Sequence, residues 1–557
     1  MRIINGIGVS PGLAIGPLFR YVRRELRIER RKVQDIASEW TRFEAAVKAA
    51  RAELALVHTR AEAESGSVHA AIFAAQALML EDPEFLESVR AGIEEQRLGA
   101  EAALTDAADK YARLLQSLED EYLRSRVSDL SDVTHRLLRA LLGDRASPTA
   151  ALAVPSIVVA RDLSPSDTVL LDKRLVLGFC TAEGGPTSHT AILARALGLP
   201  AVVGAGGEVL SIPVGVQAIL DAGDGRLLVE PDGGTQERYR ARRSTRSAAL
   251  DRARERAQEP AVTADGHRVE VVANIGNVEG ARESLAAGAE GVGLLRTEFL
   301  YLQRSSLPDE EEQYGAYLKI LEAMGGRPVT LRTLDVGGDK DLPYLKRPHE
   351  LDPLLGVRGI RLCLAQPDIL RPQLRAALRA GAGRNLKLMF PMVATVAEVR
   401  AARALLEQCR GELAAEGRPV ADKMDVGIMV EVPAAALMAG RLAAEADFFS
   451  IGTNDLSQYT LAADRTNAQV AALASAFHPA VLRLVGMVIE AGHARGKRVG
   501  ACGELAGEPL AVPILLGLGL DEFSMNPPAI PLVKEVIRSL DLPAAREIAQ
   551  AALQLDS

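Results

Sequence analysis

The chain is poor in aromatic residues and in cysteine, and it contains no long hydrophobic run. Aromatic side chains make up 4% of its 557 residues, whereas alanine and leucine are abundant, which favours a helix-rich architecture. The four cysteines stand far apart, without the paired spacing of a disulfide framework or a zinc knuckle. No segment approaches the roughly 20 apolar residues of a membrane span, and the N-terminus lacks the features of a signal peptide. We therefore expect a reduced, cytoplasmic protein without membrane insertion.

Basic residues are also fewer than acidic residues. The 65 lysines and arginines are outnumbered by 73 aspartates and glutamates, and the resulting net charge of -8 argues against a nucleic-acid surface. Apolar residues at 48% and charged residues at 25% are typical of a globular protein. A chain of this length is expected to form roughly three to four domains.

The segment Gly184–Ile192 carries the first candidate for chemistry. Two glycines and a proline end a strand-like run, and the hydroxyls of Thr187, Ser188 and Thr190 can cap the helix-forming run that follows. His189 would then lie at a helix N-terminus, where partial positive charge keeps an imidazole neutral and attracts an anion. An isolated histidine more often caps a helix or fills a gap. The glycines and hydroxyls around this one favour a phosphoryl acceptor.

Changes in periodicity divide the first half of the chain into three parts. Residues 1–20 and 148–230 contain short apolar runs separated by turn residues, and we expect them to form one α/β unit that carries His189. Residues 34–143 have apolar residues at three- and four-residue steps, which predicts an inserted helical bundle. Residues 231–262 are rich in Arg, Glu and Ala, which predicts a charged helical linker.

An apolar cluster within the predicted bundle has two interpretations. It consists of Ala77–Leu80 with Pro83, Phe85 and Leu86. For any one of these residues, burial in the core is the more common outcome. A small apolar patch at a helix junction is also typical of a face that docks a partner protein.

Residues 263–557 show a regular alternation of strands and helices. The predicted strands are Val269–Ala273, Gly291–Arg296, Val329–Leu334, Leu386–Pro391, Val426–Val432, Phe448–Thr453, Arg498–Cys502 and Asp521–Met525. Eight parallel strands over this length predict a closed (β/α)8 barrel of the TIM type. The chemistry of such a barrel lies on the loops that follow the C-terminal ends of its strands.

Polar residues lie at the C-terminal ends of the predicted barrel strands, where they can form one shared site. They are Arg296, Arg332, Glu431, Asn454, Asp455 and Cys502, with Arg358 and Arg465 on nearby loops. The planar forks of arginine match phosphate and carboxylate groups, so the arginines predict a small polyanionic ligand. Ion pairing at the barrel rim is the alternative for any single arginine–carboxylate pair.

Two carboxylates and one thiol complete this candidate site. Glu431 and Asp455 supply hard oxygen ligands, and two carboxylates with ligand oxygens and water are a usual set for Mg²⁺ in phosphoryl transfer. Asn454 can donate a hydrogen bond to the same ligand. Cys502 would ordinarily be a small buried residue, but at the barrel mouth it can act as a proton donor whose pKa the site adjusts.

Several motifs carry a resemblance to a known family. They are Gly184–Ile192, Gly291–Phe299, Arg332–Lys340, Phe390–Met392, Val430–Pro433, Asp447–Thr460, Ala463–Arg465 and Cys502–Gly507. With these motifs the chain closely resembles enzyme I of the phosphoenolpyruvate:sugar phosphotransferase system over essentially its full length. The resemblance implies a swivelling phosphohistidine α/β domain with an inserted helical bundle, followed by a C-terminal (β/α)8 barrel.

The resemblance also implies a role for each site residue. His189 would be phosphorylated and would pass the phosphoryl group to a histidine of the carrier protein HPr, which the helical bundle would dock. Glu431 and Asp455 would hold Mg²⁺, and Cys502 would protonate the enolate of pyruvate at carbon 3. The barrel would form a homodimer. The residues that would bind phosphoenolpyruvate are Arg296, Arg332, Arg358, Asn454, Asp455 and Arg465.

Related activities remain as alternatives. A regulatory, nitrogen-type phosphorelay enzyme I usually carries an N-terminal sensor domain, which we do not expect here. Pyruvate phosphate dikinases and phosphoenolpyruvate synthases share the histidine loop and the barrel, but they need an ATP-binding domain for which this chain has no room. A non-catalytic scaffold is a third alternative, and the intact site residues argue against it: His189, Glu431, Asp455 and Cys502. Pro186 stands where some members have a basic residue, which would alter the charge near His189 without removing the acceptor.

Overall fold

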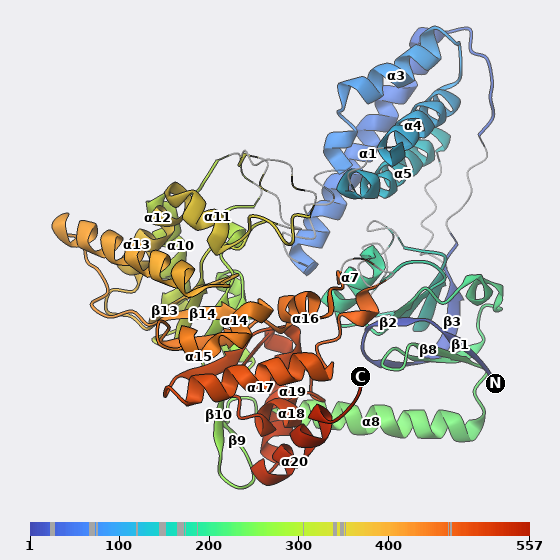
Figure 1. Cartoon of the computed structure of the whole chain (residues 1–557). Coiled ribbons are helices and arrows are strands. Elements are labelled where there is room, and N and C mark those ends of the chain that lie inside the picture. Colours follow the sequence, from blue (N-terminus) through green and yellow to red (C-terminus); the bar gives the residue numbers. More distant parts are fainter. Residues whose placement is uncertain are drawn as a thin grey trace. The chain divides into compact units, whose positions relative to one another are not determined.

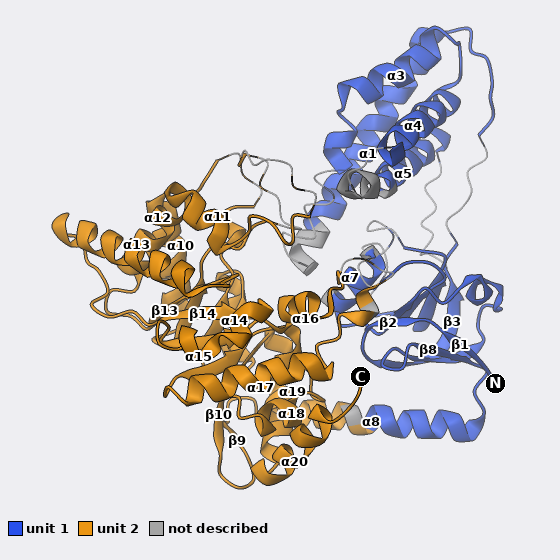
Figure 2. Ribbon diagram, in the orientation of Figure 1, with its two compact units in different colours: residues 1–244 blue, residues 245–557 orange. Residues whose placement is uncertain are grey.

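The computed structural model of the chain describes most of its residues (Figure 1). They form two compact units, residues 1–244 and residues 245–557 (Figure 2). The described residues are 1–22, 28–65, 73, 76–117, 121–143, 152–163, 167, 172, 174–185, 188–302, 304, 306–337, 342, 344–345, 350, 352–465, 467 and 470–557.

The first unit contains an eight-stranded mixed sheet in the order β1-β8-β7-β3-β4-β5-β6-β2. The strands are β1 (Arg2–Asn5), β2 (Ile7–Ser10), β3 (Leu13–Arg20), β4 (Ser156–Ala160), β5 (Val176–Thr181), β6 (Ala201–Val203), β7 (Gln217–Asp221) and β8 (Arg226–Val229). β3 pairs in parallel with β4 and antiparallel with β7, so strands from residues 156–160 and 217–221 flank the N-terminal strand in the sheet. Ile157 and Val159 belong to one buried core, while Val158 and Ala160 belong to another. The sheet therefore has a core on each face.

The described residues between β3 and β4 are mostly helical. In the described part of this segment the helices are α1 (Ile36–Ser65), α3 (Pro83–Glu94), α4 (Ala100–Ser117) and α5 (Glu121–Leu142). α3 begins where the carboxylate of Asp82 accepts a hydrogen bond from the Phe85 N–H at 2.8 Å. Phe85 is 3% exposed and its ring meets Tyr111 edge-on, so it belongs to the bundle core. The docking interpretation is therefore wrong for Phe85, whereas Leu78 is 68% exposed.

The second unit is a closed barrel of eight parallel strands, which confirms the predicted fold. Its strands are β10 (Arg268–Ile275), β11 (Val292–Leu295), β12 (Val329–Arg332), β13 (Leu386–Phe390), β14 (Val426–Val430), β15 (Phe448–Ile451), β16 (Arg498–Ala501) and β17 (Glu522–Met525). The sheet runs from β11 to β17 and then to β10, and pairing between β10 and β11 closes it. The short strand β9 (Ala261–Val262) pairs antiparallel with β10.

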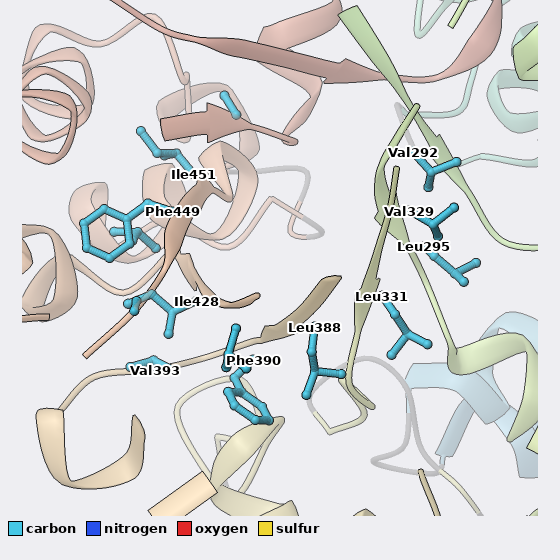
Figure 3. Packing of buried hydrophobic residues seen from close by; sticks show 14 of the residues in the cluster. Val292, Leu295, Val329, Leu331, Leu388, Phe390, Val393, Ile428, Phe449 and Ile451 are labelled. Atoms are coloured by element: carbon cyan, nitrogen blue, oxygen red, sulfur yellow. The ribbon is translucent and has the colours of Figure 1, made fainter. Parts of the chain in front are cut away.

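Residues along the barrel strands alternate between two environments. Leu388 and Phe390 belong to the large core between the strands and the surrounding helices (Figure 3). Met389 lies between them in sequence and joins Met429 and Cys502 in a separate small cluster. Because successive side chains of a strand face opposite sides, this second set points into the barrel. The interior is thus filled with side chains beneath the site.

Helices surround the barrel strands in sequence order (Figure 1). They are α9 (Val278–Ala286), α10 (Glu310–Ala323), α11 (Ile360–Ala365), α12 (Pro367–Ala380), α13 (Val396–Ala415), α14 (Pro433–Leu437), α15 (Ala439–Leu442), α16 (Thr453–Leu461), α17 (Pro479–His493), α18 (Val512–Gly517), α19 (Ile530–Ser539) and α20 (Leu542–Leu553). No helix in the described ranges combines the length and the apolar character needed to cross a membrane.

The helix α8 (Gly233–Glu255) lies within the predicted charged linker. In the middle of this helix, Arg242 Nη1 lies 2.7 Å from Asp221 Oδ2, and this carboxylate is 1% exposed. Just beyond the end of α8, the chain is held by Lys534, which is also 1% exposed. The ammonium group of Lys534 donates to the carbonyls of Ala257 and Glu259 at 3.0 Å each. A buried carboxylate therefore holds the middle of α8, and a buried ammonium group holds the chain that follows its C-terminus.

Candidate active site at the mouth of the barrel

The ends of successive barrel strands bring the predicted site residues to one face. Arg296 follows β11 and Arg332 is the last residue of β12. Glu431 follows β14, Asp455 lies in the first turn of α16 directly after β15, and Cys502 follows β16. In a closed parallel barrel these positions share one rim, because all strands point the same way.

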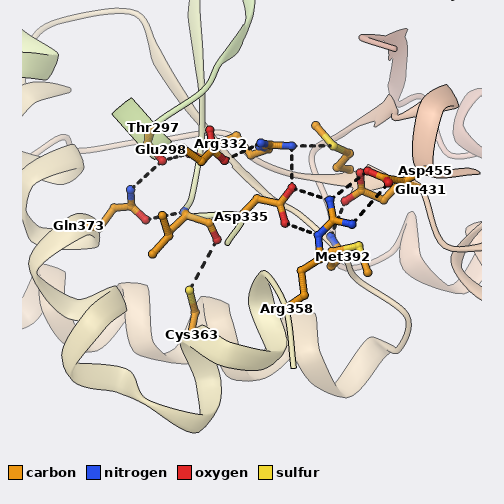
Figure 4. A network of polar contacts seen from close by, with 12 residues as sticks. Thr297, Glu298, Arg332, Asp335, Arg358, Cys363, Gln373, Met392, Glu431 and Asp455 are labelled. Atoms are coloured by element: carbon orange, nitrogen blue, oxygen red, sulfur yellow. Dashed lines mark hydrogen bonds and ion pairs between the residues drawn. The ribbon is translucent and has the colours of Figure 1, made fainter. Parts of the chain in front are cut away.

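Arg332 lies between two carboxylates, neither of which was among the predicted site residues. Its Nη2 donates to Glu298 Oε1 at 2.6 Å, and its Nη1 lies 3.0 Å from Asp335 Oδ2 (Figure 4). Burial disfavours the charged guanidinium, but the negative charges of Glu298 and Asp335 outweigh it and raise the pKa of Arg332. Its buried Nε has no partner among the described residues. The side chain is therefore charged, fixed in orientation, and left with one donor for a ligand.

Arg358 extends this line of alternating charges across the mouth (Figure 4). Its Nε and Nη2 donate to the two oxygens of Asp335 at 3.0 and 3.1 Å. Its Nη2 also lies 3.1 Å from Asp455 Oδ2. Burial again opposes the charge, yet Asp335 and Asp455 raise the pKa of Arg358. The donors of this predicted ligand-binding arginine are thus directed to protein carboxylates.

Glu431 is the most deeply buried acid of the site, at 1% exposure. Its Oε1 accepts a hydrogen bond from the Met392 N–H at 2.6 Å. Burial first, and then the negative charges of Asp455 and Asp335, raise the pKa of Glu431 to about 8. Met392 has φ of 57°, a left-handed conformation that costs a non-glycine residue energy. This strained backbone presents the N–H to the carboxylate.

The environment of Glu431 fits a divalent cation. The negative charge of Asp455 helps to raise the pKa of the buried Glu431, and a cation beside the two carboxylates would relieve this repulsion. Glu431 and Asp455 are hard oxygen donors of the kind that Mg²⁺ prefers. Within the described residues, no group of three or more His, Cys, Asp or Glu side chains is placed to hold a metal ion.

Two further arginines lie at the rim with exposed side chains. The pKa of Arg296 is lowered, because surrounding protein atoms desolvate the guanidinium and Arg332 adds a like charge, although the side chain reaches solvent. An anion between Arg296 and Arg332 would relieve this repulsion. Arg465 is positioned through its backbone N–H, which donates to Gln458 Oε1 at 3.1 Å.

Asn454 and Cys502 are joined to the same rim by hydrogen bonds. Asn454 Oδ1 accepts from the Glu504 N–H at 2.9 Å, and Asn274 Nδ2 donates to the Cys502 carbonyl at 2.9 Å. The Cys502 side chain is buried, and burial raises the pKa of its thiol to about 11. The thiol is therefore protonated near neutral pH, which is the form that a proton donor requires.

The predicted acceptor loop belongs to the first unit. The helix α7 (His189–Leu197) begins at His189 with Ser188 as its N-cap, and the Ser188 side chain accepts from the Ala191 N–H. Thr190 does not cap the helix as predicted, because its hydroxyl is buried and donates to Asp162 Oδ1 at 3.2 Å. Pro186, Thr187 and the His189 side chain lie outside the described residues.

Glu298, Asp335 and Met392 were missed by sequence reasoning, although each lies in one of the quoted motifs. Glu298 and Asp335 are close in sequence to the predicted arginines, and this is the signal that could have identified them. Nothing in the sequence marks the left-handed conformation of Met392.

Three family models describe the chain in order. The phosphoenolpyruvate-utilising enzyme N-terminal model matches residues 5–126, the mobile-domain model matches residues 152–225, and the phosphoenolpyruvate-binding-domain model matches residues 251–542.

Relatives similar to this chain over its whole length share one name, phosphoenolpyruvate-protein phosphotransferase. The proteins of Bacillus sp. (strain S) and Geobacillus stearothermophilus are each 46% identical over 554 residues, which is 100% of this chain and 96% of theirs. The protein of Bacillus subtilis (strain 168) is 44% identical over 557 residues, 100% of this chain and 98% of its own. The chain therefore belongs to the family of the phosphoenolpyruvate-protein phosphotransferases.

Proposed function

We propose that this enzyme transfers the phosphoryl group of phosphoenolpyruvate to the imidazole of His189 and then to a histidine of an HPr-type carrier protein. The P–O bond of phosphoenolpyruvate breaks as a P–N bond forms, and the enolate left behind becomes pyruvate when carbon 3 accepts a proton. The observation that carries the proposal is the meeting of the paired arginines with Glu431 and Asp455 at one barrel rim, in a member of this family.

Phosphoenolpyruvate carries a phosphate and a carboxylate, and the rim presents cations suited to both. Arg296 and Arg332 repel one another, so a phosphate between them gains from both charges. Arg465 and the amide of Asn454 are assigned to the same ligand. Arg358 holds Asp335 and Asp455 in place, and through them it orients the other groups.

Glu431 and Asp455 would hold the Mg²⁺ that the family resemblance implies. Bound there, Mg²⁺ neutralises charge on a phosphoryl group and orients it. Cys502 delivers the proton to carbon 3, and its raised pKa keeps the proton on sulfur until the enolate forms.

The helical bundle is assigned to carrier docking. α3 and α4 border an open groove of about 720 Å³, with Glu84, Glu87 and Asp106 among its lining residues. Asp106 is paired with Arg30, but Glu84 and Glu87 keep the groove acidic and suit a carrier with a basic face. The exposed Leu78, which precedes α3 in the sequence, suits an apolar contact with the same carrier. The barrel is assigned to homodimerisation, and the protein to the cytoplasm.

The test is labelling with phosphoenolpyruvate that carries a radioactive phosphoryl group, in the presence of Mg²⁺. The expected product is an acid-labile, base-stable phosphoprotein, and the label should move to an added HPr-type carrier. His189→Ala should take no label while it still binds phosphoenolpyruvate. Label on the His189→Ala protein, or none on the wild type, would refute the proposal. Presenting sugar-type and nitrogen-type carriers separately identifies the cognate one.

A further inference from the structure

A chain of buried side chains behind the rim is not used by the chemistry described above. Gln373 on α12 is fully buried, and it reaches the ends of the two strands that carry the phosphate-binding arginines. Its Oε1 accepts from the Leu334 N–H at 2.8 Å, two residues beyond Arg332. Its Nε2 donates to Thr297 Oγ1 at 3.1 Å, one residue beyond Arg296 (Figure 4).

Thr297 completes a bridge between the two strand ends. Its hydroxyl donates to the Arg332 carbonyl at 2.9 Å, and the side chain is fully buried. The pairing of β11 with β12 shifts register between Val292 and Leu295 and resumes at the pair Leu295–Leu331, directly before the two arginines. Beyond this last backbone pair, the side-chain hydrogen bonds of Thr297 and Gln373 join the two strand ends.

The side-chain amide of Gln373 makes three hydrogen bonds: one through its oxygen and two through its nitrogen. Its Nε2 also donates to the Tyr317 hydroxyl at 3.1 Å, so one amide serves one donor and two acceptors. A carboxylate, a hydroxyl or an alkyl group cannot replace all three bonds. Leaving any of these buried groups without a partner is costly, so the bridge holds one arrangement.

We propose that Gln373 is a positioning residue that sets the separation of Arg296 and Arg332, and with it the fit of the site to the phosphoryl group. It touches no ligand and acts through Thr297 and the backbone of Leu334. This inference rests on the proposed function, because it assigns Gln373 to the phosphoenolpyruvate site. A displacement of about 1 Å at such a site can lower a rate by about 100-fold.

Gln313 on α10 offers a matched control. It has the same side chain and is 1% exposed, and its Oε1 accepts from the hydroxyls of Tyr301 and Tyr317 at 3.0 Å each. It shares the Tyr317 hydroxyl with Gln373, but within the described residues it makes no hydrogen bond to Thr297, Leu334 or either strand end. Gln373→Leu and Gln313→Leu should therefore lose similar stability, and only the first should alter the geometry of the arginines.

The experiment compares these full-length variants at a temperature where thermal melts show both to be folded. Gln373→Leu should raise the KM for phosphoenolpyruvate and slow labelling of His189 by about 10- to 100-fold, while Gln313→Leu stays within about twofold of wild type. Return of label to His189 from phosphorylated carrier should be unchanged in both. Equal losses in the two variants, or no loss in Gln373→Leu, would overturn the inference. A wild type that takes no label overturns the proposed function as well.

Gln373→Glu adds a readout that a purely structural role would not change. The introduced carboxylate keeps the acceptor for Leu334 but has no donor for Thr297, and protonation restores one donor. Its labelling rate relative to wild type should rise from about pH 8 to about pH 6, where a buried carboxyl of raised pKa titrates. A ratio independent of pH would count against the inference.

Discussion

Asp335 and Arg358 form a two-point ion pair inside the barrel mouth, with Oδ1 3.0 Å from Nε and Oδ2 3.1 Å from Nη2. The same carboxylate reaches Arg332 at 3.0 Å, so one buried acid orients two guanidinium groups. A two-point pair fixes the plane of a guanidinium as well as its position. The cations of the site are therefore arranged before a ligand arrives, which is the condition for electrostatic stabilisation of a transferring phosphoryl group.

Asp335→Asn should slow labelling from phosphoenolpyruvate by about 10- to 100-fold. The substitution preserves shape but removes the charge that Arg332 and Arg358 share, so both arginines lose their common orientation. Breaking a buried ion pair costs about 3–5 kcal/mol, and thermal unfolding should occur at a lower temperature. Back-transfer from phosphorylated carrier to His189 should stay at the wild-type rate.

A surface pair of the same chemistry provides the control for Asp335. Asp447 lies 2.6 Å from Arg403, but its side chain is 39% exposed. Asp447 also accepts a hydrogen bond from the Val426 N–H at 2.9 Å, and asparagine keeps an oxygen for it. Exposed pairs contribute about 0–1 kcal/mol, so Asp447→Asn should change neither labelling nor unfolding appreciably. If Asp335→Asn behaves like Asp447→Asn, the buried acid does not orient the arginines.

Glu431 should make the stability of the Mg²⁺-free protein fall as the pH rises. Burial and the nearby carboxylates raise its pKa from 4.5 to about 8. Between these values the unfolded chain has lost the Glu431 proton while the folded protein retains it, so rising pH favours the unfolded state. Thermal melts across this range should show the decline, and Glu431→Gln should make it shallower.

Binding of Mg²⁺ should show the opposite pH dependence. The cation requires the ionised carboxylate, so its affinity should increase as the pH rises through about 8. Added Mg²⁺ should raise Tm more at about pH 9 than at about pH 6, and Glu431→Gln should abolish this difference. Glu412→Gln, which removes a carboxylate from α13, should keep it. An equal gain at both pH values would exclude Glu431 as a ligand.

The barrel strands could be located from sequence because each is a short apolar run followed by polar residues. Because parallel strands end on one rim, the same regularity predicts from the sequence that Arg332, Glu431 and Asp455 lie close together. The pairing of charges could not be predicted in this way. Asp335 and Arg358 lie on loops, and the conformation of these loops determines which carboxylate each guanidinium contacts. The spacing of residues in the sequence does not predict that conformation.

Local conformation was harder to predict where tertiary contacts override it. The hydroxyl of Thr190 has the chemistry of a helix cap, but burial beside Asp162 gives it another partner. Met392 adopts a positive φ because the surrounding structure holds it against Glu431.

Lys534 should be essential for the attachment of the linker to the barrel. Besides the carbonyls of Ala257 and Glu259, it donates to that of Gly288 at 2.6 Å. Lys534→Met removes this donor from the buried carbonyls of Ala257 and Gly288, whereas the Glu259 carbonyl keeps a hydrogen bond from Arg538 Nη1 at 3.3 Å. We expect a loss on the order of 2–5 kcal/mol, measured by denaturant unfolding of the full chain. Lys319→Met, on the exposed face of α10, should have no such effect. Equal stability of the two variants would contradict this anchoring role.

Cys502→Ala should slow pyruvate formation by about 10²- to 10⁴-fold, the usual contribution of a positioned acid. Because burial raises the pKa of its thiol to about 11, Cys502 holds its proton at neutral pH and should react with alkylating agents faster as the pH rises. Cys409→Ala provides the control, since Cys409 is a fully buried thiol on α13 whose pKa is also raised to about 11. Both variants should accept label from phosphorylated carrier normally. If Cys502→Ala forms pyruvate at the wild-type rate, the proton reaches carbon 3 from another group, and the raised pKa of the thiol reflects burial alone.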